Sequence, residues 1–275
     1  MISPTATICE QDILLVDGHV HLHDCFKLAD FLKAALSNFQ TQSQQLKVNS
    51  PIAGALLLAE VSGVNAFSQL SAPQRRLESP LEPPLSEWEI HPTQEAFSVW
   101  AKHAAGHSIL ITAGRQVVTS EGIEVLALIT DAVIEDGRSL EETLVAVEQS
   151  EGLPVLPWGV GKWIGKRGKL VQAQLQSDQR DLLFAGDNGG RPGFWTLPHY
   201  FHQRPQIPGS DPLPLPAEVT RAGSFGFMTK GKLDSNRPGA SLRHILRQTQ
   251  PFIQPYGRSR APFEFIKSQS LLRMK

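Results

Sequence analysis

Short runs of apolar residues occur at intervals along the chain and predict buried strands. Each run is bounded by glycine, proline or a polar residue, as is usual where a strand leaves a core. The runs are ILLV (13–16), AGALLLAEV (53–61), SILITAG (108–114), GIEVLALI (122–129), PVLPWGV (154–160), DLLFAGD (181–187) and QIPGSD (206–211).

Between these runs, apolar residues recur at helical spacing. Residues 28–39 (LADFLKAALSNF) place an apolar stripe on one helix face. Ser139 and Glu142 have the spacing of a capping box, which predicts a helix that ends near Gly152. Further helices are predicted from residue 93 onward, over 166–176 and over 241–248.

The alternation of strands and helices predicts an α/β protein with a mostly parallel sheet and helices outside it. Six or seven such units favour a closed TIM-like barrel over a small open sheet, with a doubly wound sheet as the alternative. We expect one domain over residues 1–275, since 275 residues with 41% hydrophobic content can bury a large core. A proline-rich surface excursion is expected at 71–92 and a C-terminal helical extension at 239–275.

The composition narrows the functional classes. A formal net charge of −1 gives no reason to expect nucleic acid or an anionic membrane as a partner. No apolar run approaches the roughly 18 residues of a membrane-spanning helix, and MISPTATICEQD does not resemble a secretory signal. Two cysteines are too few for a disulfide scaffold. These features predict a cytoplasmic protein that acts on a small molecule, with a homo-oligomer possible.

Candidate chemistry begins directly after the first apolar run, in VDGHVHLHD (16–24). Asp17, His19 and His21 share one face of a strand because they are two residues apart. Two neutral imidazoles that point at a common centre favour a divalent metal, although a polar, hydrogen-bonded strand end is the alternative. Two histidines do not fill a coordination sphere, so further ligands must come from elsewhere in the chain.

Three carboxylates that follow or interrupt apolar runs are candidates for the remaining positions. Glu124 lies inside an apolar run and needs a cation or strong donors, with Arg115 as a non-metal partner. Asp211 ends the last run, where it could instead be a turn residue before a proline. Asp187 begins DNGG, which is first of all a turn.

The set DGHVHLH, GIEV (122–125) and GSD (209–211) resembles the PHP (polymerase and histidinol phosphatase) family and, more distantly, the amidohydrolases. The resemblance covers about a dozen residues that are spread over most of the chain. It implies a distorted barrel of about seven βα units, usually with phosphoester hydrolysis. It also implies metal ions at the carboxyl end of the barrel, with His19, His21, Glu124 and Asp211 as ligands.

The sequence departs from the family pattern at two places. The position two residues after the late aspartate, a histidine in the family, is Leu213 here, and the middle strand carries Trp158 and Lys162 instead of a histidine. His199 and His202 could substitute but lie outside the expected positions. A complete trinuclear site is therefore not expected. One or two divalent ions (Zn, Mn or Fe), or a degenerate site, are expected instead.

If a metal binds, it would activate water, with Asp211 orienting that water or accepting its proton and Asp17 fixing a histidine tautomer. Basic and turn residues near strand ends could hold an anionic substrate. They are Lys162, Lys166, Arg167, Asp187, Arg191 and Arg221. A P-loop is excluded, because Trp163 stands where a serine or threonine would be required.

These observations favour a metal-dependent hydrolase that acts on a small anionic substrate, in the first place a phosphoester. An amide or lactone hydrolase of the amidohydrolase type is one alternative. A barrel that has lost catalysis and binds a ligand or partner is a second. A metal-free enzyme that uses Lys162 or His19 as acid or base is a third.

Overall fold

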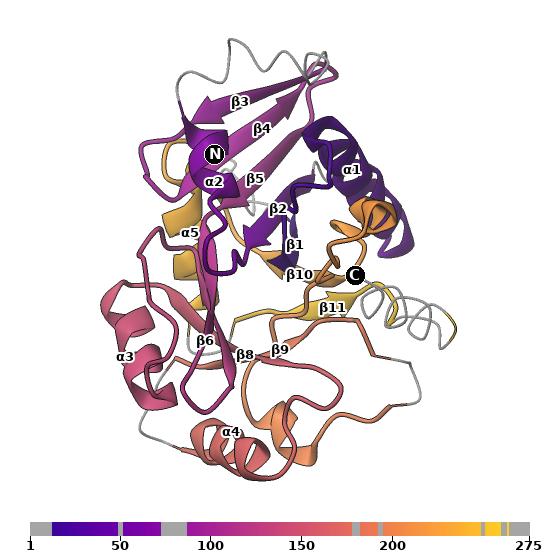
Figure 1. The fold of residues 1–275 in the computed structure, drawn as a ribbon. Helices are drawn as coiled ribbons and strands as arrows, with labels where there is room; N and C mark the ends of the chain where they lie inside the picture. The colour runs from indigo at the N-terminus through magenta and orange to yellow at the C-terminus, as the bar shows by residue number, and fades with distance from the viewer. Residues whose placement is uncertain are drawn as a thin grey trace, which may run out of the picture.

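The computed structural model describes residues 13–48, 52–72, 87–177, 182–191, 195–248, 251–259 and 263. Their strands pair in two sheets. The seven-stranded sheet has the order β11-β10-β1-β2-β5-β4-β3, and the four-stranded sheet has the order β6-β7-β8-β9 (Figure 1). The strands are β1 (Ile13–Val20), β2 (Ile52–Leu58), β3 (Trp88–Pro92), β4 (Ser98–His103), β5 (Ser108–Thr112), β6 (Gly114–Val118), β7 (Glu124–Leu128), β8 (Leu153–Trp158), β9 (Phe184–Asp187), β10 (Gly226–Lys230) and β11 (Gln254–Tyr256).

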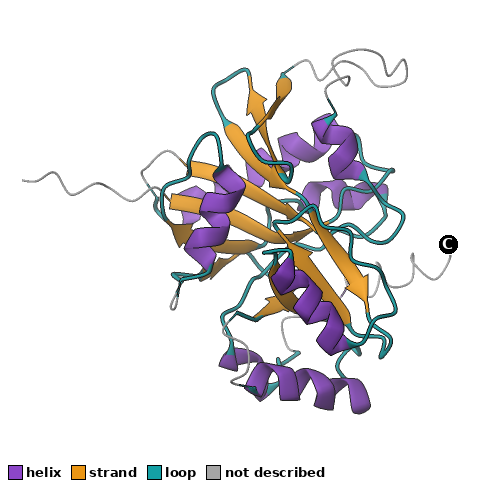
Figure 2. Cartoon of the chain, turned by 90° about the vertical axis from the view of Figure 1, so that its left-hand side faces the viewer, coloured by secondary structure: helices purple, strands orange, loops and turns teal. Residues whose placement is uncertain are grey.

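Helices lie around the two sheets (Figure 2). They are α1 (Leu28–Gln45), α2 (Ala66–Ser71), α3 (Leu140–Gln149), α4 (Lys166–Gln176) and α5 (Pro238–Leu246), with 3-10 turns η2 (His199–Gln203) and η3 (Pro216–Arg221). The capping box predicted before α3 is present, with Ser139 accepting from the Glu142 backbone and the Glu142 carboxylate accepting from Ser139. Within the described residues, no helix is long and apolar enough to cross a membrane.

Three apolar clusters explain this arrangement. One lies between the seven-stranded sheet and the helices α1 and α2, and includes Leu15, Phe31 and Leu56. A second contains residues of both sheets, such as Val16 and Val155, and packs between them. The third joins the four-stranded sheet to α3, α4 and η2. Alternate residues of β1 thus face different clusters, as the period of two along a strand requires.

The predicted (β/α)7 TIM-like barrel is wrong, because the strands form two separate sheets. Helical crossovers join parallel neighbours at β1–α1–β2 and β8–α4–β9, but β3, β4 and β5 are successively antiparallel, as are β6, β7 and β8. Apolar runs predict strands, but they do not distinguish a helical crossover from a short turn between them. The predicted parallel βα units are therefore in part antiparallel hairpins.

The structure also differs from the predictions made for individual segments. The helix expected from residue 93 is absent, and Trp88–Pro92 and Ser98–His103 instead form the antiparallel pair β3–β4. The proline-rich excursion at 71–92 therefore ends in a strand, and its residues 73–86 lie outside the described part. In the C-terminal extension, α5 is followed by strand β11 at the edge of the seven-stranded sheet, while 264–275 lie outside the described residues.

Segment 206–211 connects the two sheets. Gln206 bridges Ala185 of β9, and the Gly209 amide donates to the Asp187 carbonyl. On its other side, the Pro208 carbonyl accepts from the Gly18 amide, and the Asp211 amide donates to the His19 carbonyl. The candidate ligand Asp211 is therefore fixed against the end of β1 by backbone hydrogen bonds.

Candidate metal centre

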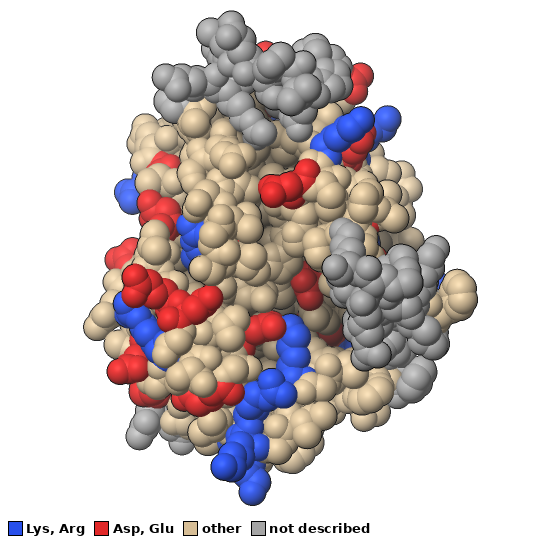
Figure 3. Space-filling view, in the orientation of Figure 1, with Lys and Arg blue, Asp and Glu red and all other residues tan. Residues whose placement is uncertain are grey.

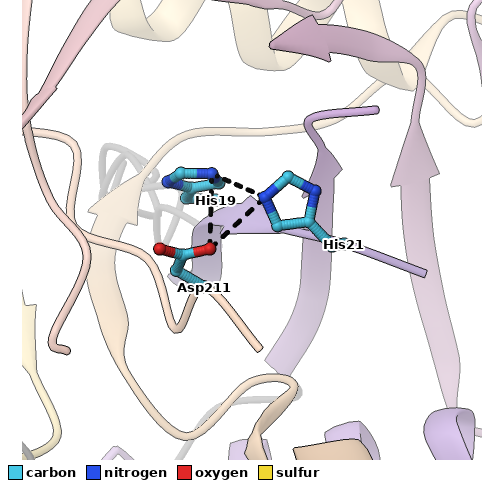
Figure 4. A group of neighbouring side chains, drawn as sticks. All are labelled: His19, His21 and Asp211. Atoms are coloured by element: carbon cyan, nitrogen blue, oxygen red, sulfur yellow. Dashed lines mark hydrogen bonds and ion pairs between the residues drawn. The ribbon is translucent and has the colours of Figure 1, made fainter. Parts of the chain in front are cut away.

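His19, His21 and Asp211 converge at the carboxyl end of β1 (Figure 4). His19 is 2% exposed and His21 is 8% exposed. β1 brings the two imidazoles to one side, and segment 206–211 supplies the carboxylate from a distant part of the sequence. The convergence of these three side chains, each predicted as a ligand, agrees with the sequence analysis.

The three ligand atoms form a nearly equilateral triangle. The Nε2 atoms of His19 and His21 are 3.1 Å apart, and the Oδ1 of Asp211 lies 3.7 Å and 3.3 Å from them respectively. Metal–ligand distances of about 2.0–2.2 Å place tetrahedral ligands roughly 3.3–3.6 Å apart. The triangle thus has about the size of one face of a zinc-like tetrahedron, whose fourth position these three residues do not supply.

Burial and neighbouring charges together set the protonation of this cluster. Desolvation lowers the pKa of His19 to about 4, so its imidazole is neutral near pH 7. Burial alone would raise the pKa of Asp211, but the neighbouring imidazoles and the Lys162 ammonium outweigh it and hold that pKa well below its usual range. A neutral imidazole and an ionised carboxylate are the forms that bind a divalent cation.

The buried His19 makes the stability of the metal-free protein pH-dependent. Because its pKa is about 4 when folded and about 6.5 when unfolded, the unfolded chain binds the proton first. His19 therefore contributes its full stabilisation above pH 6.5 and loses it progressively as the pH falls toward 4. Urea unfolding of wild type and His19→Gln between pH 4 and 7 should show a steeper acid loss for wild type. Parallel curves would contradict this assignment.

Two polar side chains that the sequence analysis missed complete the surroundings of the triangle. The Oε1 of Gln116 in β6 lies 3.2 Å from His19 Nε2, and the Nδ2 of Asn188 donates to Asp211 Oδ2 at 2.9 Å. Asn188 leaves the other carboxylate oxygen facing the histidines. Asn188 sits in the turn after an apolar run, which was a usable signal, whereas nothing in the local sequence marks Gln116.

Glu60 is a third residue that the sequence analysis missed, although it is next to last in the apolar run 53–61. Its side chain is 5% exposed, accepts from the Phe67 amide at 2.6 Å and lies 3.5 Å from Arg115. Burial raises its pKa, and the Phe67 amide and the Arg115 guanidinium partly oppose that rise. Arg115, considered as a partner for Glu124, thus pairs with Glu60.

Glu124 does not join the three-residue group. Glu124 is the first residue of β7, and its Oε2 lies 2.5 Å from the Nζ of Lys162. The metal ligand implied by the family resemblance is thereby paired with a lysine of this chain. Lys162 follows β8, as the sequence analysis expected for a residue beside the site.

Asp17 is fully buried and binds backbone rather than imidazole. It accepts from the amides of Ser210 and Gly223, each at 2.8 Å, and from the His19 amide at 3.4 Å. Burial raises its pKa to about 7, although these hydrogen bonds oppose the rise. Asp17 thus ties β1 to the segment that carries Asp211. Its described hydrogen bonds are to backbone amides, whereas fixing a histidine tautomer would require one to an imidazole nitrogen.

Most of the other residues predicted to bind substrate form ion pairs or hydrogen bonds with neighbouring residues of the chain. Asp187 pairs with Arg191 at 3.1 Å, and Arg221 donates to the Ser210 carbonyl. Arg167 donates to the carbonyls of Gly122 and Gly161, and Lys166 is the exposed first residue of α4. His199 and His202 lie in η2 and do not belong to the ligand group.

The comparisons with known proteins give a fold but no family. No model of a protein family matches the sequence, and no curated protein matches it. The structure is similar to the crystal structure of PsfC from Pseudomonas syringae PB-5123, with a TM-score of 0.50 and 12% identity over 96% of this chain and 98% of that one. At this identity the likeness shows that the two chains share a fold over nearly their whole lengths.

Proposed function

We propose that this protein is a metal-dependent hydrolase of a small anionic substrate, in the first place a phosphoester. The observation that carries the proposal is the buried triangle of His19, His21 and Asp211. These three side chains each offer one ligand atom, all within 4.8 Å of one another, and two imidazoles with a carboxylate are a set that divalent cations such as Zn, Mn or Fe accept.

His19, His21 and Asp211 would hold a divalent ion, which would supply a Lewis acid to activate water and polarise the substrate. The chain contributes the geometry. Asn188 fixes one oxygen of Asp211, and the hydrogen bond from the Asp211 amide to His19 fixes its backbone. Gln116, at 3.2 Å from His19, is placed to orient a water molecule through its amide. Asp211 is also a candidate to accept a proton from that water.

The surroundings agree with a small anionic substrate. Figure 3 shows basic side chains in a band next to acidic ones on the lower part of this face. Lys162 lies beside the cluster, where its ammonium acts electrostatically on both His19 and Asp211.

We also propose a cytoplasmic location, since Cys25 is an exposed free thiol and a reducing compartment preserves such groups.

The test combines metal analysis with a substrate panel. Protein expressed with added Zn, Mn or Fe should contain a near-stoichiometric ion, and a His19→Ala/His21→Ala variant should lose it. Phosphate esters, lactones and amides are then assayed with the loaded protein. Hydrolysis of phosphate esters that disappears in the variant supports the proposal. Metal uptake without turnover would favour a binding protein, and protein that takes up no ion on titration would rule out the metal centre.

A further inference from the structure

The ion pair between Glu124 and Lys162 stands beside the ligand triangle and has no role in holding it. Its two charged atoms are 2.5 Å apart, and the side chains are 21% and 36% exposed respectively. The negative charge of Glu124 is therefore already balanced by this chain. A second metal ion would have to compete with an ammonium group for that carboxylate.

The loop before Lys162 is shaped to hold its side chain in this place. Residues 159–162 form a turn in which the Lys162 amide donates to the Gly159 carbonyl at 3.0 Å, and Gly161 has a φ of +81°. The lysine folds back over Gly159 so closely that a Cβ there would lie 2.8 Å from its Cδ and 3.0 Å from its Cε. Glycine at 159 thus leaves the space that the lysine side chain occupies.

The position of the ammonium suits an oxyanion. It has three N–H donors, and its described hydrogen bond, to Glu124, uses one of them. The exposure of the side chain leaves the group accessible from solvent. In the antiparallel β6–β7 pair, Glu124 lies opposite Val118 and therefore on the same face of the sheet as Gln116, whose Oε1 is 3.2 Å from His19 Nε2. The ion pair thus lies on the side of β6 and β7 that faces the triangle.

We propose that Lys162 takes the place of a second metal ion, so that the centre holds one divalent ion per chain and the ammonium binds a phosphoryl oxygen of the substrate. This inference rests on the proposed function and sharpens it. Glu124 then acts as a positioning residue, because it orients Lys162 without touching the ion or the substrate.

The experiment uses full-length protein loaded with Zn²⁺ or Mn²⁺. Native mass spectrometry gives the number of ions per chain, and calorimetry gives the affinities for the ion and for inorganic phosphate. Lys162→Met removes the charge and keeps the length of the side chain. Gly159→Ala keeps the charge and displaces it. Lys169→Met, at an exposed position of α4, is the matched control for loss of one positive charge.

We expect one ion per wild-type chain. Lys162→Met and Gly159→Ala should each weaken phosphate binding at least tenfold, while metal affinity changes less than threefold and circular dichroism shows both variants folded. Lys169→Met should bind phosphate like wild type. Two ions per wild-type chain, or unchanged phosphate affinity in Lys162→Met, would overturn this inference and leave the hydrolase proposal intact. Failure to bind any ion would overturn both.

Discussion

Replacement of Asp211 by asparagine is expected to weaken divalent metal binding by more than about 100-fold, because loss of a ligand should cost at least as much as loss of a residue that only orients one. The substitution preserves the shape of the side chain and removes its charge. It also suits the backbone, since Asp211 has a φ of 42°, in the left-handed region that asparagine tolerates well. The change therefore tests the ligand without an added conformational penalty.

The measurement is calorimetric titration of metal-free protein with Zn²⁺ or Mn²⁺. Asp131→Asn provides the control, because it removes the same charge from an exposed position. Metal-free Asp211→Asn should unfold at a lower urea concentration than wild type, because the lowered pKa of Asp211 means that its ionised form stabilises the fold. Circular dichroism before the titration checks that the variant is folded. Tight metal binding by Asp211→Asn would show that the carboxylate is not a ligand and would leave the histidine pair without its third partner.

Replacement of Gly209 by alanine is expected to destabilise the protein by about 3 kcal/mol, the upper part of the usual range for overpacking. A Cβ at this position would lie 2.1 Å from the backbone nitrogen of His19 and 2.6 Å from its Cα. Backbone atoms cannot move aside as the end of a flexible side chain can. Segment 206–211 would therefore have to separate from β1, which would also carry Asp211 away from the histidines.

Urea unfolding measures the first effect, and metal titration of the folded fraction measures the second. Gly190→Ala is the matched control, since the nearest atom to its added Cβ would be the Asn188 side-chain oxygen at 3.2 Å. We expect the control to cost less than about 1 kcal/mol. A Gly209→Ala protein as stable as wild type would contradict the close approach of the two segments.

The three residues of the candidate metal centre were largely predictable because they depend on local pattern. The two-residue spacing of His19 and His21 follows from strand geometry, and Asp211 stands at the end of an apolar run. Glu124 was identified by the same reasoning, as a carboxylate within a buried strand. Its pairing with Lys162 was not predicted. A carboxylate inside an apolar run indicates that a cation lies nearby, but the sequence does not show whether that cation is a metal or an ammonium group.

The sequence by itself determined the buried strands β1, β2 and β5, the capped helix α3, and three residues suited to bind a metal. These depend on short-range periodicity, capping and side-chain chemistry. Only the tertiary structure decided that the strands form two sheets rather than a barrel, that Glu124 faces a lysine and that Gln116 and Asn188 border the ligands. Strand order and long-range pairing depend on how distant segments pack. The local pattern of apolar and polar residues does not determine which strands pair.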